Sequence, residues 1–375
     1  MDFSTIDGYE SGKAYLKSVI ESRRVPHAQV LVAQNNQSAL PLALWYVNEL
    51  LDKAPSFGRL LHPDVHFVFP INNSPLVKKD PLCSDFMELF RAAVMDNPHL
   101  SLDQWYAAAG IEDKGALIKV DMAREILKHT ALKPVQHHSR IVVIWGAEQM
   151  NTEAANKLLK VIEEPPKNTL FLLLVQREER MLQTISSRCQ RLVIHPEPFE
   201  ALVGHIEKRG VSTERAKEIA LRSEGSLNIA LSMLSEDDSE GDFEQLFVEW
   251  VRAAFKVKKH PSEVAVLLAW AERLASLSKE RQRRFLRFAQ RQIRSAMLLQ
   301  YGAEQLVAKK ELADGFLLER FAPFVHEENT LDLNTLIEEA LYNHSRNANT
   351  KLLFSDMALQ MTKLIHKPKR INPSP

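Results

Sequence analysis

Arg188, in the run Ser187-Arg-Cys189, carries a side chain that could bind an anion. Its planar guanidinium stays charged and can bind two oxygen atoms at once. On spacing alone, a surface arginine that closes a helix before a strand is the favoured interpretation. Cys189 has no histidine-containing partner motif, so we interpret it as a small packed side chain and not as a nucleophile.

The adjacent carboxylates Glu163 and Glu164 do not form a catalytic pair in our interpretation. Neighbouring side chains on a helix diverge by about 100°, so the two groups do not share one site and joint acid–base catalysis is not expected. They mark the end of a helix before Pro165-Pro166, because proline cannot continue the hydrogen-bond ladder. Asn156 and Lys157, earlier on the same helix, are candidates for a surface that faces a partner or a DNA backbone.

Histidine pairs give no metal site. His62 with His66, and His137 with His138, each lack a nearby third ligand, and we interpret all four as plain surface residues. Residues 52–58 contain no cysteine, so the soft ligands of a structural zinc site are absent there. The sequence therefore predicts no bound metal.

Two apolar runs, residues 141–144 and 170–175, predict the elements that position the candidate side chains around Glu163 and Arg188. The runs are continuous and do not alternate, which is typical of strands buried on both faces of a parallel sheet. Between them Ala154, Leu158 and Ile162 recur at helical spacing. Strand, helix and strand at this length predict a βαβ unit within an α/β fold.

A second strand and helix, residues 29–33 and 39–51, enclose the loop where a phosphate-binding loop would lie. Such a loop needs glycines that bring backbone N–H groups round the phosphates, a lysine that reaches them and a hydroxyl on magnesium. The loop Ala33-Gln-Asn-Asn-Gln-Ser-Ala-Leu-Pro41 contains no glycine. An ordinary strand-to-helix turn is the better interpretation.

The run Asn156-Lys-Leu-Leu-Lys-Val-Ile-Glu-Glu-Pro-Pro166, followed by Ser187-Arg-Cys189, resembles the nucleotide-binding module of bacterial DNA polymerase III clamp-loader subunits. These AAA+ proteins include the ATPase gamma/tau and its relative delta-prime, and the resemblance is strongest over residues 25–70 and 119–195. It implies an AAA+ module with a parallel sheet flanked by helices over residues 1–197. A small three-helix lid over 198–235 and an all-α C-terminal collar for oligomerisation over 243–366 complete the expected architecture.

The family's nucleotide contacts are missing from this sequence at three places. Set against the family pattern, Ala39 falls at the lysine and Leu40 at the magnesium-binding hydroxyl, in a loop that begins at Ala33 and includes Ser38. An acidic pair is replaced by Trp145 and Gly146, with Glu148 two residues too far along, and a lid arginine is replaced by Asn228. The resemblance therefore implies a degenerate site, no cofactor and no ATP hydrolysis by the isolated chain.

The same resemblance gives Arg188, with Ser187 and Cys189, a role. It implies an arginine finger that acts in trans on the ATP of a neighbouring subunit during DNA replication. The implied partners are gamma/tau ATPase subunits and the delta subunit, and indirectly the sliding clamp and primed DNA. The first hypothesis is a subunit that resembles delta-prime; the alternatives are an ATP-hydrolysing gamma/tau-like subunit with an unusual site, and the clamp-opening delta subunit.

Composition agrees with a multidomain protein of a reducing compartment. The 375 residues carry 48 basic and 48 acidic side chains, so no overall field favours nucleic acid. Only two cysteines are present, and no disulfide framework is suggested. The first residues lack the basic and apolar regions of a signal peptide, and no run approaches the roughly 18 apolar residues of a membrane span. We expect a cytoplasmic protein.

Further segments are predicted mainly by pattern. Residues 71–118 hold two helices, 83–95 and 102–109, to which no chemistry is assigned. The basic run 279–294 predicts a helix with Phe285, Phe288, Ala289 and Ile293 towards a core and its arginines outside. A solvated or subunit-facing helix is the favoured interpretation, and contact with DNA phosphates is the alternative. The remaining predicted helices are 9–22, 119–132, 199–209, 213–223, 227–234, 243–256, 262–277, 279–301, a broken stretch at 312–324, 331–345 and 349–366.

Overall fold

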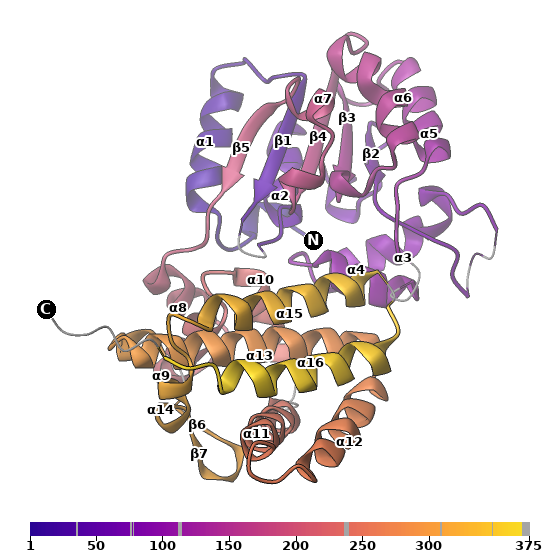
Figure 1. The fold of residues 1–375 in the computed structure, drawn as a ribbon. Coiled ribbons are helices and arrows are strands. Elements are labelled where there is room, and N and C mark those ends of the chain that lie inside the picture. The colour runs from indigo at the N-terminus through magenta and orange to yellow at the C-terminus, as the bar shows by residue number, and fades with distance from the viewer. Residues whose placement is uncertain are drawn as a thin grey trace, which may run out of the picture. The chain divides into compact units, whose positions relative to one another are not determined.

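The computed structural model describes residues 1–34, 37–75, 77, 79–111, 115–235, 240–307, 310–346 and 348–369. The chain divides into two compact units, Met1–Ser235 and Glu236–Pro375. The first contains a sheet with helices around it, and the second is mainly helical (Figure 1). In the described part of the chain no helix is both long and apolar enough to pass through a membrane.

A five-stranded parallel sheet with the order β2-β3-β4-β1-β5 organises the first unit. Its strands are β1 (Ala28–Ala33), β2 (Val65–Val68), β3 (Arg140–Trp145), β4 (Thr169–Val175) and β5 (Gln190–Ile194). Every residue of β1, β3 and β4 is buried. Val143 pairs with Leu172 and Val30 with Leu173. The continuous apolar runs are thus the inner strands of the sheet, as their pattern predicted.

Helices flank this sheet (Figure 1). They are α1 (Glu10–Glu21), α2 (Leu40–Leu50), α5 (Val120–Ala131), α6 (Thr152–Glu163) and the short α7 (Gln183–Ser186). The α6 helix shows how the sequence sets their bounds. Asn151 caps its first turn by accepting the Ala154 N–H at 2.9 Å, Leu158 and Ile162 are fully buried, and the helix ends before Pro165.

The segment 71–118 holds α3 (Cys83–Asp96) and α4 (Leu102–Ala109), close to the predicted bounds. Ser101 caps α4 in a capping box, with its hydroxyl on the Gln104 N–H and the Gln104 side chain on the Ser101 N–H. Both helices contribute to the main core: Phe90 and Trp105 are fully buried, with ring centroids 5.7 Å apart. This segment is therefore an integral part of the first unit.

Three further helices complete the first unit: α8 (Phe199–Glu207), α9 (Thr213–Arg222) and α10 (Leu227–Ser235). They share a small core of their own, with Leu202, Ile206 and Ala216 fully buried. Residues 236–239 lie outside the described residues. The helix that was predicted to begin at residue 243 begins at Glu240, three residues earlier.

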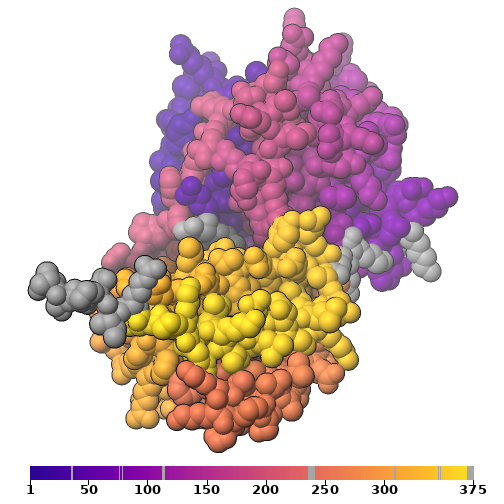
Figure 2. Space-filling view, viewed as in Figure 1, coloured from indigo at the N-terminus to yellow at the C-terminus, as the bar shows by residue number. Residues whose placement is uncertain are grey.

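The second unit contains six helices within its described residues: α11 (Glu240–Lys256), α12 (Glu263–Ala275), α13 (Lys279–Gln300), α14 (Leu318–Phe321), α15 (Thr330–Ser345) and α16 (Thr350–Ile365). Figure 2 shows α15 and α16, in yellow, covering one face of this unit. Trp250 of α11 and Trp270 of α12 stack in its core with centroids 5.1 Å apart and planes at 13°. The Trp270 indole N–H donates to the Leu246 carbonyl at 2.8 Å.

One part of the second unit is not helical. The strands β6 (Glu311–Leu312) and β7 (Phe316–Leu317) form an antiparallel hairpin where a broken helical stretch was expected. Asp314 and Gly315 both have positive φ, at 55° and 64°, and an Asp-Gly pair is favoured in hairpin turns for that reason. The all-α expectation therefore needs this one correction. Short 3-10 turns lie at Phe3–Thr5, Phe57–Arg59, Ala147–Gln149, Glu178–Arg180, Glu304–Leu306, Ala313–Gly315 and Ala322–Phe324.

The basic helix α13 lies within the second unit, and its arginine side chains are less exposed than the sequence predicted. Its predicted apolar stripe is confirmed, since Phe285, Phe288, Ala289 and Ile293 are all buried. The arginines expected outside differ: Arg284, Arg287 and Arg291 are half-buried, and Arg294 is exposed. The guanidinium carbons of Arg284 and Arg291 lie 5.7 and 5.8 Å from the ring centroids of Phe243 and Phe288. Much of the positive charge of this helix thus covers aromatic rings.

Candidate functional site

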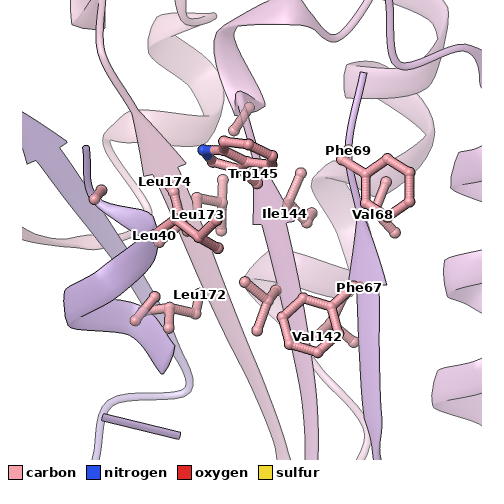
Figure 3. Close-up of a cluster of buried hydrophobic side chains, with 14 of the residues drawn as sticks. Leu40, Phe67, Val68, Phe69, Val142, Ile144, Trp145, Leu172, Leu173 and Leu174 are labelled. Carbon is pink, nitrogen blue, oxygen red and sulfur yellow. The ribbon is translucent and has the colours of Figure 1, made fainter. Parts of the chain in front are cut away.

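The apolar residues at the two ends of the turn between β1 and α2, where a phosphate-binding loop was sought, are buried. Ala33, Ala39 and Leu40 are 2%, 2% and 0% exposed. Figure 3 shows Leu40 within the same cluster of buried side chains as Leu172 and Leu173 of β4. Asn35 and Asn36 of the predicted loop lie outside the described residues. At the positions that correspond to the family's lysine and hydroxyl, the side chains therefore belong to the core.

The polar residues of this turn bind to the rest of the unit. The Ser38 hydroxyl donates to the Leu100 carbonyl at 3.0 Å, and the Gln37 side-chain amide donates to the Gly225 carbonyl at 2.7 Å. The Gln37 carbonyl in turn accepts from the Gln176 side chain at 3.3 Å. Both Gln37 and Ser38 are essentially fully buried. These bonds join the turn to segment 71–118, to the end of β4 and to the loop before α10.

The end of β3, where the family has an acidic pair, is enclosed by segment 71–118. Trp145 is 2% exposed and its ring lies 6.0 Å from that of Phe90, as part of the apolar cluster of Figure 3. Gly146 has φ 69°, and a Cβ there would meet Pro70 Cγ at 2.8 Å and Leu102 Cδ1 at 3.3 Å. Gly146 therefore has no room for a side chain, and a carboxylate in place of the Trp145 ring would be buried among apolar atoms.

Glu148 is the first acidic residue after that strand end, and the backbone binds one oxygen of its carboxylate. Its Oε1 accepts the Gln176 N–H at 3.1 Å, and the residue is 8% exposed. Burial raises the pKa of this carboxyl, while the N–H groups of Glu148 itself, Gln176 and Arg177 act in the opposite direction. Gln176 thus connects Glu148 to the turn at Gln37, a link that sequence reasoning did not foresee.

The loop before α10 carries Asn228, which stands where the family has a lid arginine. The Asn228 side-chain oxygen accepts the Ser226 hydroxyl at 2.9 Å, and Asn228 is 7% exposed. In the same loop the Gly225 carbonyl accepts the Glu197 N–H at 2.8 Å in addition to Gln37. The Glu197 carboxylate accepts the Tyr9 N–H. The loop is therefore bonded to the N-terminal segment, to the link before α8 and to the β1–α2 turn.

Arg188 lies on the surface directly after α7, and its side chain is 36% exposed. Its Nε lies 3.0 Å from Glu163 Oε2, and its Nη2 donates to Glu163 Oε1 at 3.3 Å. Its Nη1 donates to the Thr184 carbonyl at 2.8 Å. Sequence reasoning treated Glu163 as a helix end and missed this pairing. A possible signal was that both residues belong to the runs of one motif.

The neighbours of Arg188 in the motif differ in exposure. Ser187 is exposed, and its hydroxyl donates weakly to the Thr184 carbonyl at 3.5 Å. Cys189 is half-buried and packs against the main core, and burial raises the pKa of its thiol to about 11. A thiol with such a pKa is protonated near neutral pH, so Cys189 is unsuited to nucleophilic chemistry. Asn156 and Lys157 are both exposed on α6.

The histidines differ in part from the expected surface positions. His62 is 6% exposed, and burial lowers the pKa of His66 to about 3. The His66 ring stacks on His129 at 4.2 Å, whereas the rings of His137 and His138 lie 3.8 Å apart, with His138 exposed as predicted. Nowhere in the described ranges do three His, Cys, Asp or Glu side chains meet in a way that could hold a metal ion.

The parallel sheet, its strand-to-helix turn at the end of β1 and the helices around it define an α/β module of the AAA+ type. A family model described as "DNA polymerase III, delta subunit" matches residues 9–198, about half of the chain. The chain therefore belongs to this family.

Individual relatives agree with this assignment. The chain is 32% identical over 110 residues to DNA polymerase III subunit delta' of Bacillus subtilis, covering 29% of this chain and 33% of the relative. It is 32% identical over 135 residues to subunit delta' of Escherichia coli, covering 36% and 40%. It is also 29% identical over 128 residues to subunit gamma of Buchnera aphidicola, covering 32% and 36%. The matched segments thus span only about a third of the length of these relatives.

Proposed function

We propose that this chain is a delta-prime-like subunit of the DNA polymerase III clamp loader that does not hydrolyse ATP and supplies Arg188 in trans to a neighbouring ATPase subunit. One observation carries the proposal. The polar groups of the β1–α2 turn are bonded to the chain itself, whereas the guanidinium of Arg188 reaches the surface. In the first arrangement the Gln37 amide and the Ser38 hydroxyl already donate within the chain, and in the second a cation is left for a partner.

The missing nucleotide chemistry has a physical basis. Phosphate oxygens need convergent backbone N–H groups and a cation, and magnesium needs oxygen ligands. The side chains of Ala39 and Leu40 offer neither a cation nor an oxygen ligand, and Trp145 and Gly146 replace the carboxylates that would hold the metal. Degenerate motifs at both strand ends, and Asn228 in the lid loop, support a subunit without a nucleotide cofactor.

Arg188 fits the chemistry of phosphoryl transfer on a neighbour. Negative charge spreads over the γ-phosphate oxygens in the transition state, and a guanidinium delivered by another chain stabilises it, by about 10³–10⁵ in rate in GTPases. Arginine suits this task because its fork keeps its charge and binds two oxygens. Ser187 and Cys189 flank it, and the packed Cys189 side chain fixes the segment to the core.

The rest of the proposal comes from the family. Helices α8–α10, within residues 198–235, serve as a lid, and residues 243–366 serve as a collar through which the subunit assembles. The proposed partners are gamma/tau ATPase subunits and the delta subunit, with the sliding clamp and primed DNA as indirect partners in DNA replication. On this proposal the chain acts in the cytoplasm and is no enzyme by itself.

Equilibrium binding of a fluorescent ATP analogue tests the proposal against an ATPase with an unusual site. We expect no magnesium-dependent binding by the isolated chain, with a gamma/tau ATPase subunit as the positive control. Micromolar, magnesium-dependent binding would overturn the proposal.

A pull-down tests the other alternative, the clamp-opening delta subunit. We expect this chain to be retained by gamma/tau and delta subunits but not by the sliding clamp alone. Strong direct retention by the isolated clamp would assign the delta role instead.

A further inference from the structure

Glu163 occupies one particular edge of the Arg188 guanidinium. Its carboxylate lies along the side formed by Nε and Nη2, with Nε–Oε2 at 3.0 Å and Nη2–Oε1 at 3.3 Å. The Thr184 carbonyl accepts from Nη1 at 2.8 Å. A guanidinium has five N–H donors, so these contacts leave one donor on each terminal nitrogen. Those two donors belong to the end of the fork, which suits two oxygen atoms of a phosphate.

The groups that hold Arg188 are themselves fixed by buried neighbours. Glu163 is the last residue of α6, and the preceding Ile162 is fully buried in the main core. Thr184 lies in α7 beside Ile185, which is also fully buried. The carboxylate and the carbonyl are therefore offered from two anchored helices, and their relative positions do not depend on long flexible segments.

We propose that Glu163 is a positioning residue, which holds the Nε/Nη2 edge of Arg188 so that the end of its fork faces the neighbouring subunit's triphosphate. The inference rests on the proposed trans role of Arg188 and extends it to a second residue. Glu163 does not touch the phosphate in this arrangement; it acts through Arg188. The ligand class is a phosphate group presented by another chain.

The energetics favour a role in positioning over a role in stability. The side chains of Arg188 and Glu163 are 36% and 54% exposed, and ion pairs exposed to this degree add little to folding. Free arginine side chains, in contrast, lose considerable rotamer freedom when they bind. An ion pair with Glu163 that restricts Arg188 before the phosphate binds reduces the rotamer entropy that Arg188 loses in the transition state. We therefore expect loss of Glu163 to lower kcat by about two- to fivefold, the range of a surface pair.

The experiment measures DNA-stimulated ATP turnover in the reconstituted clamp loader with Glu163→Ala, Glu163→Gln and Glu163→Ala/Arg188→Ala subunits. Glu164→Ala is the matched control, because Glu164 is the adjacent carboxylate and is also exposed. We expect Glu163→Ala to lower kcat with an unchanged KM for ATP, and Glu163→Gln, which keeps one acceptor oxygen, to lie between it and the parent. In the Arg188→Ala background, Glu163→Ala should have no further effect.

Each outcome decides the inference. An unchanged kcat for Glu163→Ala, an equal fall for Glu164→Ala, or an additive fall in the double variant would overturn the positioning role while Arg188 keeps its own. A rise in kcat would overturn it as well, since Glu163 would then compete with the phosphate for Arg188. If Arg188→Ala itself leaves turnover unchanged, the proposed function fails first. Thermal unfolding and assembly of every variant should match the parent.

Discussion

The β1–α2 turn and the surface around Arg188 belong to one unit, but their polar side chains differ in burial and in hydrogen bonding. In the turn, Gln37 and Ser38 are buried and bonded to distant parts of the same chain. At Arg188 the cation is exposed, and its partners leave part of its fork unused. Buried bonds of the first kind specify a single structure, while exposed pairs of the second kind can exchange partners at little cost. On our proposal, ligand chemistry has moved from the interior of the module to its edge.

Removing the cation should have the largest effect. Arg188→Ala in the reconstituted assembly is expected to lower DNA-stimulated turnover at the neighbouring ATP site by about 10³, because the transition-state charge loses its guanidinium. Steady-state ATP hydrolysis measures this, and gel filtration should show intact assembly.

Arg191→Ala is the matched control. Arg191 is an exposed arginine three residues along the chain, and its Nε and Nη2 donate to the two carboxylate oxygens of Glu178, each at 2.7 Å. Equal losses in the two variants would mean that turnover depends on the general charge of this surface and not on Arg188.

Placing an acid at the closed end of β3 should destabilise the first unit and restore no activity. Trp145→Asp removes a buried ring and adds a carboxylate among apolar atoms, so we expect the free energy of unfolding to fall by about 3–5 kcal/mol. Urea unfolding measures the loss. Trp145→Phe, which keeps an aromatic ring, should lose much less. A stable Trp145→Asp protein that binds magnesium-ATP would contradict our description of this region as closed.

Acid should weaken the closed region as well. Burial lowers the pKa of His99 to about 4, and the nearby groups are Arg209, Asp7, His205 and Lys13. Its folded pKa is below the unfolded value of about 6.5, so its contribution is complete above pH 6.5 and is lost as the pH falls towards 4. Between pH 7 and pH 5 this single group accounts for about 2 kcal/mol of unfolding free energy.

Urea unfolding of the parent and of His99→Asn at both pH values checks this expectation. The pH dependence should be smaller in the variant by about that amount. Some dependence should remain, because burial also lowers the pKa of His66, to about 3. An identical pH dependence in the two proteins would place His99 in contact with water.

The smallest test makes the same substitution in both regions. Ser38→Ala leaves the buried Leu100 carbonyl without its donor, so we expect a loss of about 1–2 kcal/mol in unfolding free energy. Ser187→Ala removes an exposed hydroxyl with a 3.5 Å contact and should be nearly neutral. Equal losses would remove the distinction between the two regions.

Much of the fold could be predicted because the signals are local. The continuous runs at β3 and β4, and the apolar stripe and double proline of α6, define their elements almost to the residue. The hairpin β6–β7 was missed although Asp314-Gly315 gave a turn signal, because its strands are only two residues long. Helical periodicity on either side outweighed that signal.

Motif spacing singles out Arg188 and the positions of the missing nucleotide groups, because spacing is a property of the chain. The roles given to these residues stay predictions. The closure of the turn could not be predicted, since Leu100 and Gly225 meet Ser38 and Gln37 only after folding. The same holds for Glu163, which lies 25 residues before Arg188. The packing of segment 71–118 into the main core likewise depends on contacts that form only in the folded chain.

The stacked Trp250 and Trp270 give the second unit an optical property of its own. Indoles 5.1 Å apart with planes inclined by 13° are close enough to couple their excited states, so we expect a paired band in circular dichroism. No other indole pair stacks in this way among the described rings. The band would vanish if α11 and α12 separated, so an unlabelled sample can report on this unit while the first is titrated or unfolded.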